Sequence, residues 1–168
     1  MTMNNNLTKK DIQLMEQELT HRLTVLRPKL LEEVKTARAF GDLSENFEYK
    51  AAKQEKNRNE SRIRYLQNMI RTAHIVEEAP RGDGAALYDK ITVTMADGKQ
   101  ATYQVVTTMR TDPLHGLISM ESPVGKALLG RKAGDRVHIQ IDEKFGYDLT
   151  IETIEKGQDD SSIPLNSY

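Results

Sequence analysis

The chain has 168 residues, of which 29% are charged and 5% aromatic, and it contains no cysteine and no tryptophan. The missing cysteine excludes disulfides, thiol nucleophiles and thiolate metal sites. Residues 1–74 carry 14 Lys or Arg against 10 Asp or Glu, whereas residues 75–168 carry 10 against 15. This asymmetry suggests two modules with different partners, but two ordinary solvated surfaces would explain it equally well.

The N-terminus does not have the composition of a targeting segment. Its first ten residues, "MTMNNNLTKK", lack the apolar stretch of a signal peptide, and no run of about 18 apolar residues follows. We expect a soluble cytoplasmic protein that has no membrane partner. We also expect it to be a monomer.

The first half of the chain has the periodicity of two long helices. Apolar residues recur at every third or fourth position from Ile12 to Ala37, which predicts a helix with one apolar stripe. Thr8 or Asn6 is expected to cap its start. Pro28 lies inside this pattern, and because it lacks an N–H it predicts a kink or a short break.

The second helix is predicted to run from about Glu45 to Ala73. Its seam has the heptad spacing of a coiled coil, with positions Tyr49, Ala52, Lys56, Asn59, Ile63, Leu66, Ile70 and Ala73. A short connection makes the two helices an antiparallel hairpin over residues 1–76, with its tip at residues 41–45. The polar seam positions Lys56 and Asn59 would then face Leu31 and Pro28.

The second half changes to strand periodicity after a turn-rich linker at residues 77–86. A β-hairpin turns at residues 96–98, further strands follow at 116–120, 135–141 and 146–156, and "SPVGKALLG" at 122–130 predicts a short helix. We therefore predict an α+β fold class, in which a small, mostly antiparallel α+β domain over residues 87–156 follows the hairpin. The polar residues 157–168 are expected to be a flexible tail.

The predicted tip, "GDLSEN", contains two candidate metal ligands, Asp42 and Glu45. Their spacing is that of a capping box, so both acids are also explained as an ordinary helix start. Against that explanation, a third acid follows at Glu48, and basic residues flank the turn. Carboxylate oxygens suit Mg²⁺, but two of them make an incomplete site, so a partner would have to supply the remaining ligands.

Three stretches of the sequence resemble one known family. "ARAFGDLSENFEYKAAKQE", "RPKLLEEV" and "ISMESPVGKALLGRKAGDRV" resemble the Gre factors, bacterial transcription elongation factors of the GreA/GreB type. The resemblance spans residues 8 to 155, and "DLSEN" and "EYKAAK" favour a GreA-like member. It implies a coiled-coil hairpin and an FKBP-like domain that docks at the secondary channel rim of bacterial RNA polymerase, so that the hairpin enters the channel.

The resemblance also implies roles for individual residues. Asp42 and Glu45 match the acids that help the polymerase to cut backtracked RNA, so the chain would stimulate cleavage without being an enzyme. It would have no cofactor of its own, because the Mg²⁺ is supplied within the polymerase active site. Arg38 and Lys53 match a basic patch that faces the nascent RNA 3′ end, and Lys50 is expected to add to it.

One residue departs from the family pattern, and two other functions compete with transcript cleavage. Phe47 stands where the family often has a small residue, and it is expected to pack at the tip or to contact the polymerase or a base. A Gre-like regulator could occupy the same channel without stimulating cleavage. An FKBP-like domain also raises prolyl isomerase activity, which the scarcity of aromatic residues argues against.

Overall fold

The computed structural model describes residues 5–41, 46–77, 82–159 and 162–167. These residues form two units, which are described separately. The helical unit contains Ile12–Ala73, and the second unit combines Asn6–Asp11 with His74–Ser167. Together they make an α+β protein. No helix within the described ranges is long and apolar enough to span a membrane.

The first arm of the helical unit is helical throughout but changes its winding once. It consists of α1 (Lys9–His21), the π-helix η1 (Arg22–Leu26) and α2 (Arg27–Arg38). Pro28 lies in the first turn of α2, where its missing N–H is least costly. The Arg27 N–H donates to the Arg22 carbonyl five residues back, which is the π-helical pattern. The predicted break is therefore a π-helical turn directly before the proline.

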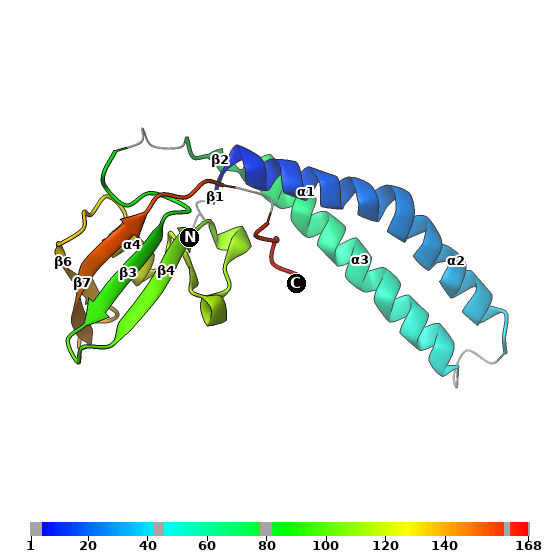
Figure 1. The fold of residues 1–168 in the computed structure, drawn as a ribbon. Helices are drawn as coiled ribbons and strands as arrows, with labels where there is room; N and C mark the ends of the chain where they lie inside the picture. The colour runs from blue at the N-terminus through cyan, green and yellow to red at the C-terminus, as the bar shows by residue number, and fades with distance from the viewer. Residues whose placement is uncertain (1–4, 42–45, 78–81, 160–161, 168) are drawn as a thin grey trace. The chain divides into compact units, whose positions relative to one another are not determined.

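The second arm is the single helix α3 (Phe47–Thr72), which runs antiparallel to α2 (Figure 1). Every predicted seam position is buried or half-buried, including the polar Lys56 and Asn59. Met15, Ile63 and Leu66 have almost no exposed surface. The heptad prediction is therefore confirmed over the length of the helix.

The contacts across the hairpin agree with the predicted facing of Pro28 and Asn59, because their neighbours Arg27 and Glu60 form an ion pair. Asn59 also accepts a hydrogen bond at 3.0 Å from Nη1 of Arg22, which lies in η1. Two bidentate ion pairs join the arms on either side of this contact, Arg27 with Glu60 and Arg62 with Glu18.

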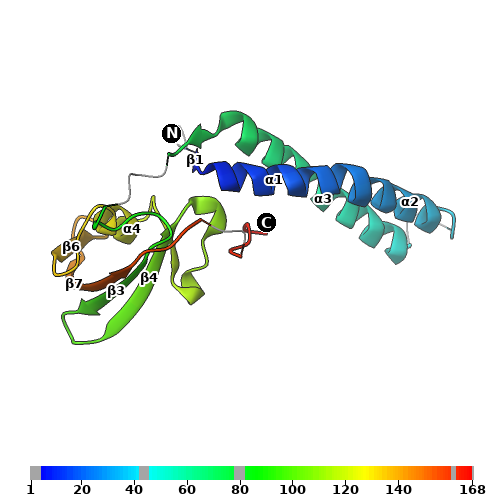
Figure 2. The same ribbon diagram turned by 45° about the horizontal axis from the view of Figure 1, so that its top comes forward.

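The second unit is built on a five-stranded sheet in the order β5-β4-β3-β7-β6 (Figure 2). Its strands are β3 (Lys90–Met95), β4 (Gln100–Val106), β5 (Leu117–Ser119), β6 (Arg136–Gln140) and β7 (Gly146–Glu155). All neighbours are antiparallel except β4 and β5, which pair in parallel. The 3₁₀ turns η2 (Thr108–Arg110) and η3 (Pro113–His115) lie in the connection between those two strands. The predicted strands are confirmed.

The short helix α4 (Pro123–Leu128) closes the core of this unit. Ser122 caps it by accepting a hydrogen bond from the Gly125 N–H at 3.0 Å, and Pro123 occupies the first turn. Leu128 is fully buried against the sheet residues Ile91, Val93 and Ile151. The motif "SPVGKALLG" thus has the structural role that its turn and helix signals predict.

A second small sheet brings the N-terminal residues into the second unit. β1 (Asn6–Leu7) pairs in parallel with β2 (His74–Ile75). Thr8 then caps α1, because its Oγ1 accepts from the Asp11 N–H and the Asp11 carboxylate accepts from the Thr8 N–H. Of the two predicted caps, Thr8 is the one observed.

Asp11 and Arg110 form a fully buried ion pair in the second unit. The Arg110 guanidinium also pairs with Asp159 and donates to the Tyr88 hydroxyl at 2.9 Å. Thr107 donates to the Asp11 carboxylate at 2.6 Å. A buried charge is tolerated when it is paired and hydrogen-bonded. Both charges are paired here and hydrogen-bonded through their other atoms, while Nε of Arg110 and Oδ1 of Asp11 are joined by the ion pair alone at 3.3 Å.

The predicted domain limits differ from the structure at both ends of the second unit. Asn6–Asp11 and His74–Ile75 belong to that unit and not to the hairpin. The predicted tail is also not free of contacts, because the Gly157 N–H donates to Asp89 and the Asn166 N–H donates to the Met109 carbonyl. The sequence missed these contacts because they join residues far apart in the chain.

Gly125 is predicted to tolerate no side chain. A Cβ at this position would lie 2.1 Å from the Ser119 carbonyl oxygen, which is backbone and cannot rotate away. Gly125→Ala should therefore destabilise the second unit by about 2 kcal/mol, which is typical of overpacking. Native-state hydrogen exchange of the β3 amides measures the loss. The exposed neighbour substitution Lys126→Ala should change protection little, and equal effects of the two substitutions would contradict the assignment.

Tyr88 should make the stability of the second unit fall at high pH. Its burial disfavours the phenolate and raises its pKa from 10 to about 12. Between these values the unfolded chain loses a proton that the folded chain keeps, so stability decreases as pH rises, by about 3 kcal/mol in total. Urea unfolding between pH 9 and 12 should show this decrease in wild type and in Tyr103→Phe. In Tyr88→Phe the decrease should be smaller by about 3 kcal/mol. A residual decrease should remain in all three proteins, because burial also raises the pKa of Tyr147.

Candidate functional site

The end of the helical hairpin carries the predicted site, and the structure describes both of its sides. Asp42 and Glu45 lie outside the described residues, which end at Gly41 and resume at Asn46. Gly41 has φ +140° and is exposed, and this backbone conformation favours glycine. The structure therefore shows which residues hold the end of the hairpin on either side of the two acids.

Asn46 holds the start of α3. Its Oδ1 accepts a hydrogen bond from the Tyr49 N–H at 2.9 Å, so Asn46 is the N-cap. Its Nδ2 donates to the Ala37 carbonyl at 2.7 Å, near the end of α2. α3 begins at Phe47, not near Glu45 as predicted, and Asn46 is its N-cap. The predicted capping box of Asp42 and Glu45 lies outside the described residues.

Two of the predicted basic residues meet at one aromatic ring. The Arg38 guanidinium carbon lies 5.4 Å from the Tyr49 ring centroid, and the Lys53 Nζ lies 6.0 Å from the same centroid. Arg38 also donates to the Tyr49 hydroxyl at 3.2 Å, and this hydrogen bond lowers the pKa of the phenol. Tyr49 therefore gathers a cation from each arm of the hairpin.

The third predicted basic residue lies on a different ring. The Lys50 Nζ is 5.7 Å from the Phe47 ring centroid. Arg38, Lys50 and Lys53 form no ion pair with any carboxylate that the structure describes, whereas Arg58, further along α3, pairs with Glu55 at 2.8 Å. No carboxylate in the described part of the chain neutralises these three cations, and a cluster of this kind attracts anions such as phosphate.

The chemistry of the two acids suits an incomplete metal site. Within the described ranges, no group of three or more His, Cys, Asp or Glu residues could hold a metal ion. Asp42 and Glu45 would add two hard oxygen ligands, which Mg²⁺ accepts when phosphate or another protein completes its shell. Since Asn46 caps α3, neither carboxylate is needed for that role.

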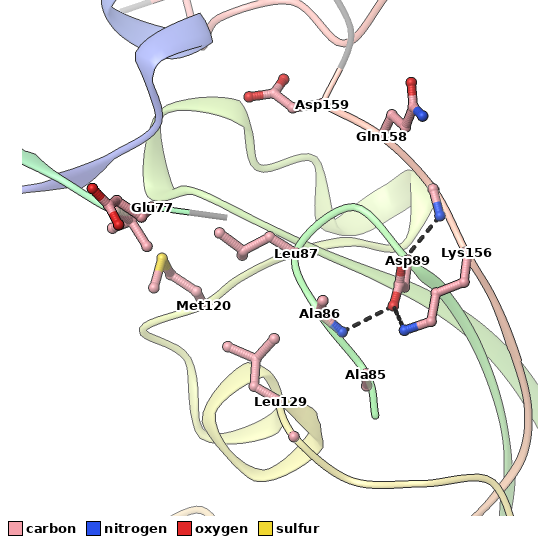
Figure 3. A pocket seen from close by; sticks show the side chains of 13 residues that line it. Glu77, Ala85, Ala86, Leu87, Asp89, Met120, Leu129, Lys156, Gln158 and Asp159 are labelled. Carbon is pink, nitrogen blue, oxygen red and sulfur yellow. Dashed lines mark hydrogen bonds and ion pairs between the residues drawn. The ribbon is translucent and has the colours of Figure 1, made fainter. Parts of the chain in front are cut away.

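The second unit contains a hollow of about 530 Å³, shown in Figure 3. Its walls include the aliphatic side chains of Leu87, Met120 and Leu129. Asp89, at one side, already accepts from the Ala86 N–H, the Gly157 N–H and the Lys156 Nζ. The described lining contains no aromatic residue, which gives no support to an aromatic proline-binding pocket.

Family comparisons define the class of this protein as a transcription elongation factor. Residues 5–75 match the family model described as "Transcription elongation factor, N-terminal", and residues 81–156 match "Transcription elongation factor, GreA/GreB, C-term". The chain belongs to the GreA/GreB family of transcription elongation factors. The resemblance carried by the tip and "SPVGKALLG" motifs is therefore confirmed.

Individual relatives are similar over most of their length. Transcription elongation factor GreA of Geobacillus kaustophilus is 46% identical over 136 residues, covering 80% of this chain and 86% of that one. GreA of Bacillus subtilis is 42% identical over 135 residues with the same coverage. The crystal structure of GreA factor homolog 1 of Thermus thermophilus aligns with a TM-score of 0.41 at 27% identity, covering 90% of this chain and 98% of that one.

Sequence reasoning missed two residues that organise this end of the hairpin, Asn46 and Tyr49. Both have a sequence signal in retrospect. Asn is among the preferred N-cap residues, and Tyr49 is the only aromatic residue in the predicted seam. The capping-box spacing of the two acids predicts that the helix starts near Glu45, which places Asn46 inside the helix and not at its N-cap.

Two substitutions of Asn46 should distinguish the effects of its two hydrogen bonds. Asn46→Ala removes the acceptor for the Tyr49 N–H and should weaken the start of α3 by about 1 kcal/mol. Asn46→Asp keeps that acceptor and loses only the donor to Ala37. Hydrogen exchange of the Tyr49 amide, measured by NMR, should accelerate about fivefold in Asn46→Ala and remain near wild type in Asn46→Asp.

A matched control is available within the same helix. Asn57→Ala removes an exposed asparagine from the middle of α3 and should leave the Tyr49 amide unchanged. Equal exchange in all three variants would show that Asn46 is not the cap.

Proposed function

We propose that this chain enters the secondary channel of bacterial RNA polymerase and stimulates cleavage of the nascent transcript by the polymerase active site. The observation that carries the proposal is the hydrogen bonding of Asn46, whose side chain caps α3 and also binds the Ala37 carbonyl of α2. Because Asn46 fills the N-cap position, the two acids that precede it in the sequence are suited to an external role. The rescued complexes would be backtracked or arrested ones in the cytoplasm.

In this proposal each group at the end of the hairpin has one task. Asp42 and Glu45 supply carboxylate oxygens to Mg²⁺ that the polymerase holds, since two carboxylates alone bind Mg²⁺ weakly. When bound between the two proteins, that ion supplies activation of water for phosphodiester hydrolysis. Arg38, Lys50 and Lys53 attract the phosphates of the RNA 3′ segment, and their lack of ion pairs with described carboxylates supports this task.

Transcript cleavage in a purified backtracked complex tests the proposal. Wild type should release short 3′ RNA fragments, and Asp42→Ala or Glu45→Ala should slow their release by roughly 100-fold, the loss expected when metal binding is impaired. Both variants should still compete with wild type for the polymerase, because docking does not depend on the two carboxylates. Glu33→Ala, which removes an exposed acid from α2, is the matched control and should cleave normally.

Two results would contradict this proposal. If wild type binds the polymerase and inhibits RNA synthesis without releasing fragments, the chain is a non-cleaving regulator of the same channel. If the Asp42 and Glu45 variants cleave as fast as Glu33→Ala, the acids do not hold the metal.

A further inference from the structure

The end of the hairpin exposes two phenylalanine side chains. Phe47, the first residue of α3, is 80% exposed, and Phe40, just beyond α2, is 73% exposed. The hydrogen bond from Asn46 to the Ala37 carbonyl joins the two short stretches that carry them. A single exposed aromatic residue needs no explanation, but two at one end of a helical hairpin form a candidate binding surface.

Basic side chains lie over the aromatic rings at this end of the hairpin. Lys50 lies over the Phe47 ring, and Arg38 and Lys53 lie over the Tyr49 ring. The pairing of a ring with a cation twice on the first turns of α3, Phe47 with Lys50 and Tyr49 with Lys53, matches the needs of single-stranded nucleic acid. Such a strand offers a base to stack on each ring and a phosphate for each cation.

The position of Lys50 over the Phe47 ring favours RNA over an apolar pocket on another protein. A Phe that inserts into an apolar pocket would carry Lys50 toward the same pocket, and burying an unpaired ammonium is costly. An unpaired base next to its own phosphate satisfies both groups at once. The two neighbours of Phe47 in this argument, Lys50 and Tyr49, are both fixed on the helix that Asn46 caps.

We propose that Phe47 is a stacking platform for an unpaired RNA base, with Lys50 holding an adjacent phosphate. The setting of this contact, the 3′ segment of a backtracked transcript, rests on the proposed function. The contact itself is a property of the free chain. It adds a base-dependent component of affinity to the sequence-independent attraction of the three cations.

An abasic oligonucleotide separates stacking from charge. The free full-length chain is titrated against a fluorescein-labelled nine-nucleotide oligoadenylate and against the same backbone with stable abasic sites. Fluorescence anisotropy should show about tenfold tighter binding of the base-containing strand to wild type, the effect expected of one stacked base. Phe47→Ala should abolish this preference, and Phe47→Trp should restore it.

Phe145→Ala is the matched control, because Phe145 is a 58% exposed phenylalanine in the second unit. It should keep the full preference for bases. Equal affinity of wild type for both strands would overturn the proposal. So would a preference that persists in Phe47→Ala, or a Phe47→Ala substitution that weakens polymerase binding without changing the RNA preference, which would place the ring on a protein surface.

Transcript cleavage keeps this result distinct from the proposed function. If wild type cleaves and the free chain shows no base preference, the stacking proposal fails and the cleavage role stands. If the base preference depends on Phe47 but wild type releases no fragments, the stacking contact stands and the cleavage role fails.

Discussion

The side-chain amide of Asn46 is the constraint on which the end of the hairpin depends. It can accept and donate at the same time, and it uses both abilities, toward the Tyr49 N–H in α3 and toward the Ala37 carbonyl in α2. A carboxylate in its place could only accept. One neutral residue therefore starts one helix and ties it to the other.

The rest of the hairpin is held by polar contacts as much as by apolar ones. Its buried apolar residues are few, and bidentate pairs such as Arg62 with Glu18 cross the seam between them. Partly buried charge pairs contribute little net stability, but a slipped register would leave each charge without its partner. The pairs therefore select one alignment of the two arms, which sets how Ala37 meets Asn46.

The sequence predicted most of the regular structure because helices and strands depend on local periodicity. The predictions that failed share one cause: a side chain can bond either to a residue nearby in the sequence or to one far away, and local patterns show only the first kind. The Thr-x-x-Asp spacing at Thr8 and Asp11 gives a capping box. α3, by contrast, is capped by Asn46, whose side chain also bonds to the opposite helix, and this second bond has no signal in the local sequence. The buried pair of Arg110 and Asp11 was equally hidden, since 99 residues separate its members.

Under the proposed function, the incomplete metal site prevents RNA cleavage by the free chain. Two carboxylates cannot hold Mg²⁺ tightly alone, so the free chain would not hydrolyse the RNA that its cations attract. Only a polymerase that supplies the remaining ligands would complete the chemistry. The cations and aromatic rings on the first turns of α3 would act earlier, because attraction and stacking need no metal. Binding of RNA and its cleavage would then be separable, with the second conditional on the partner.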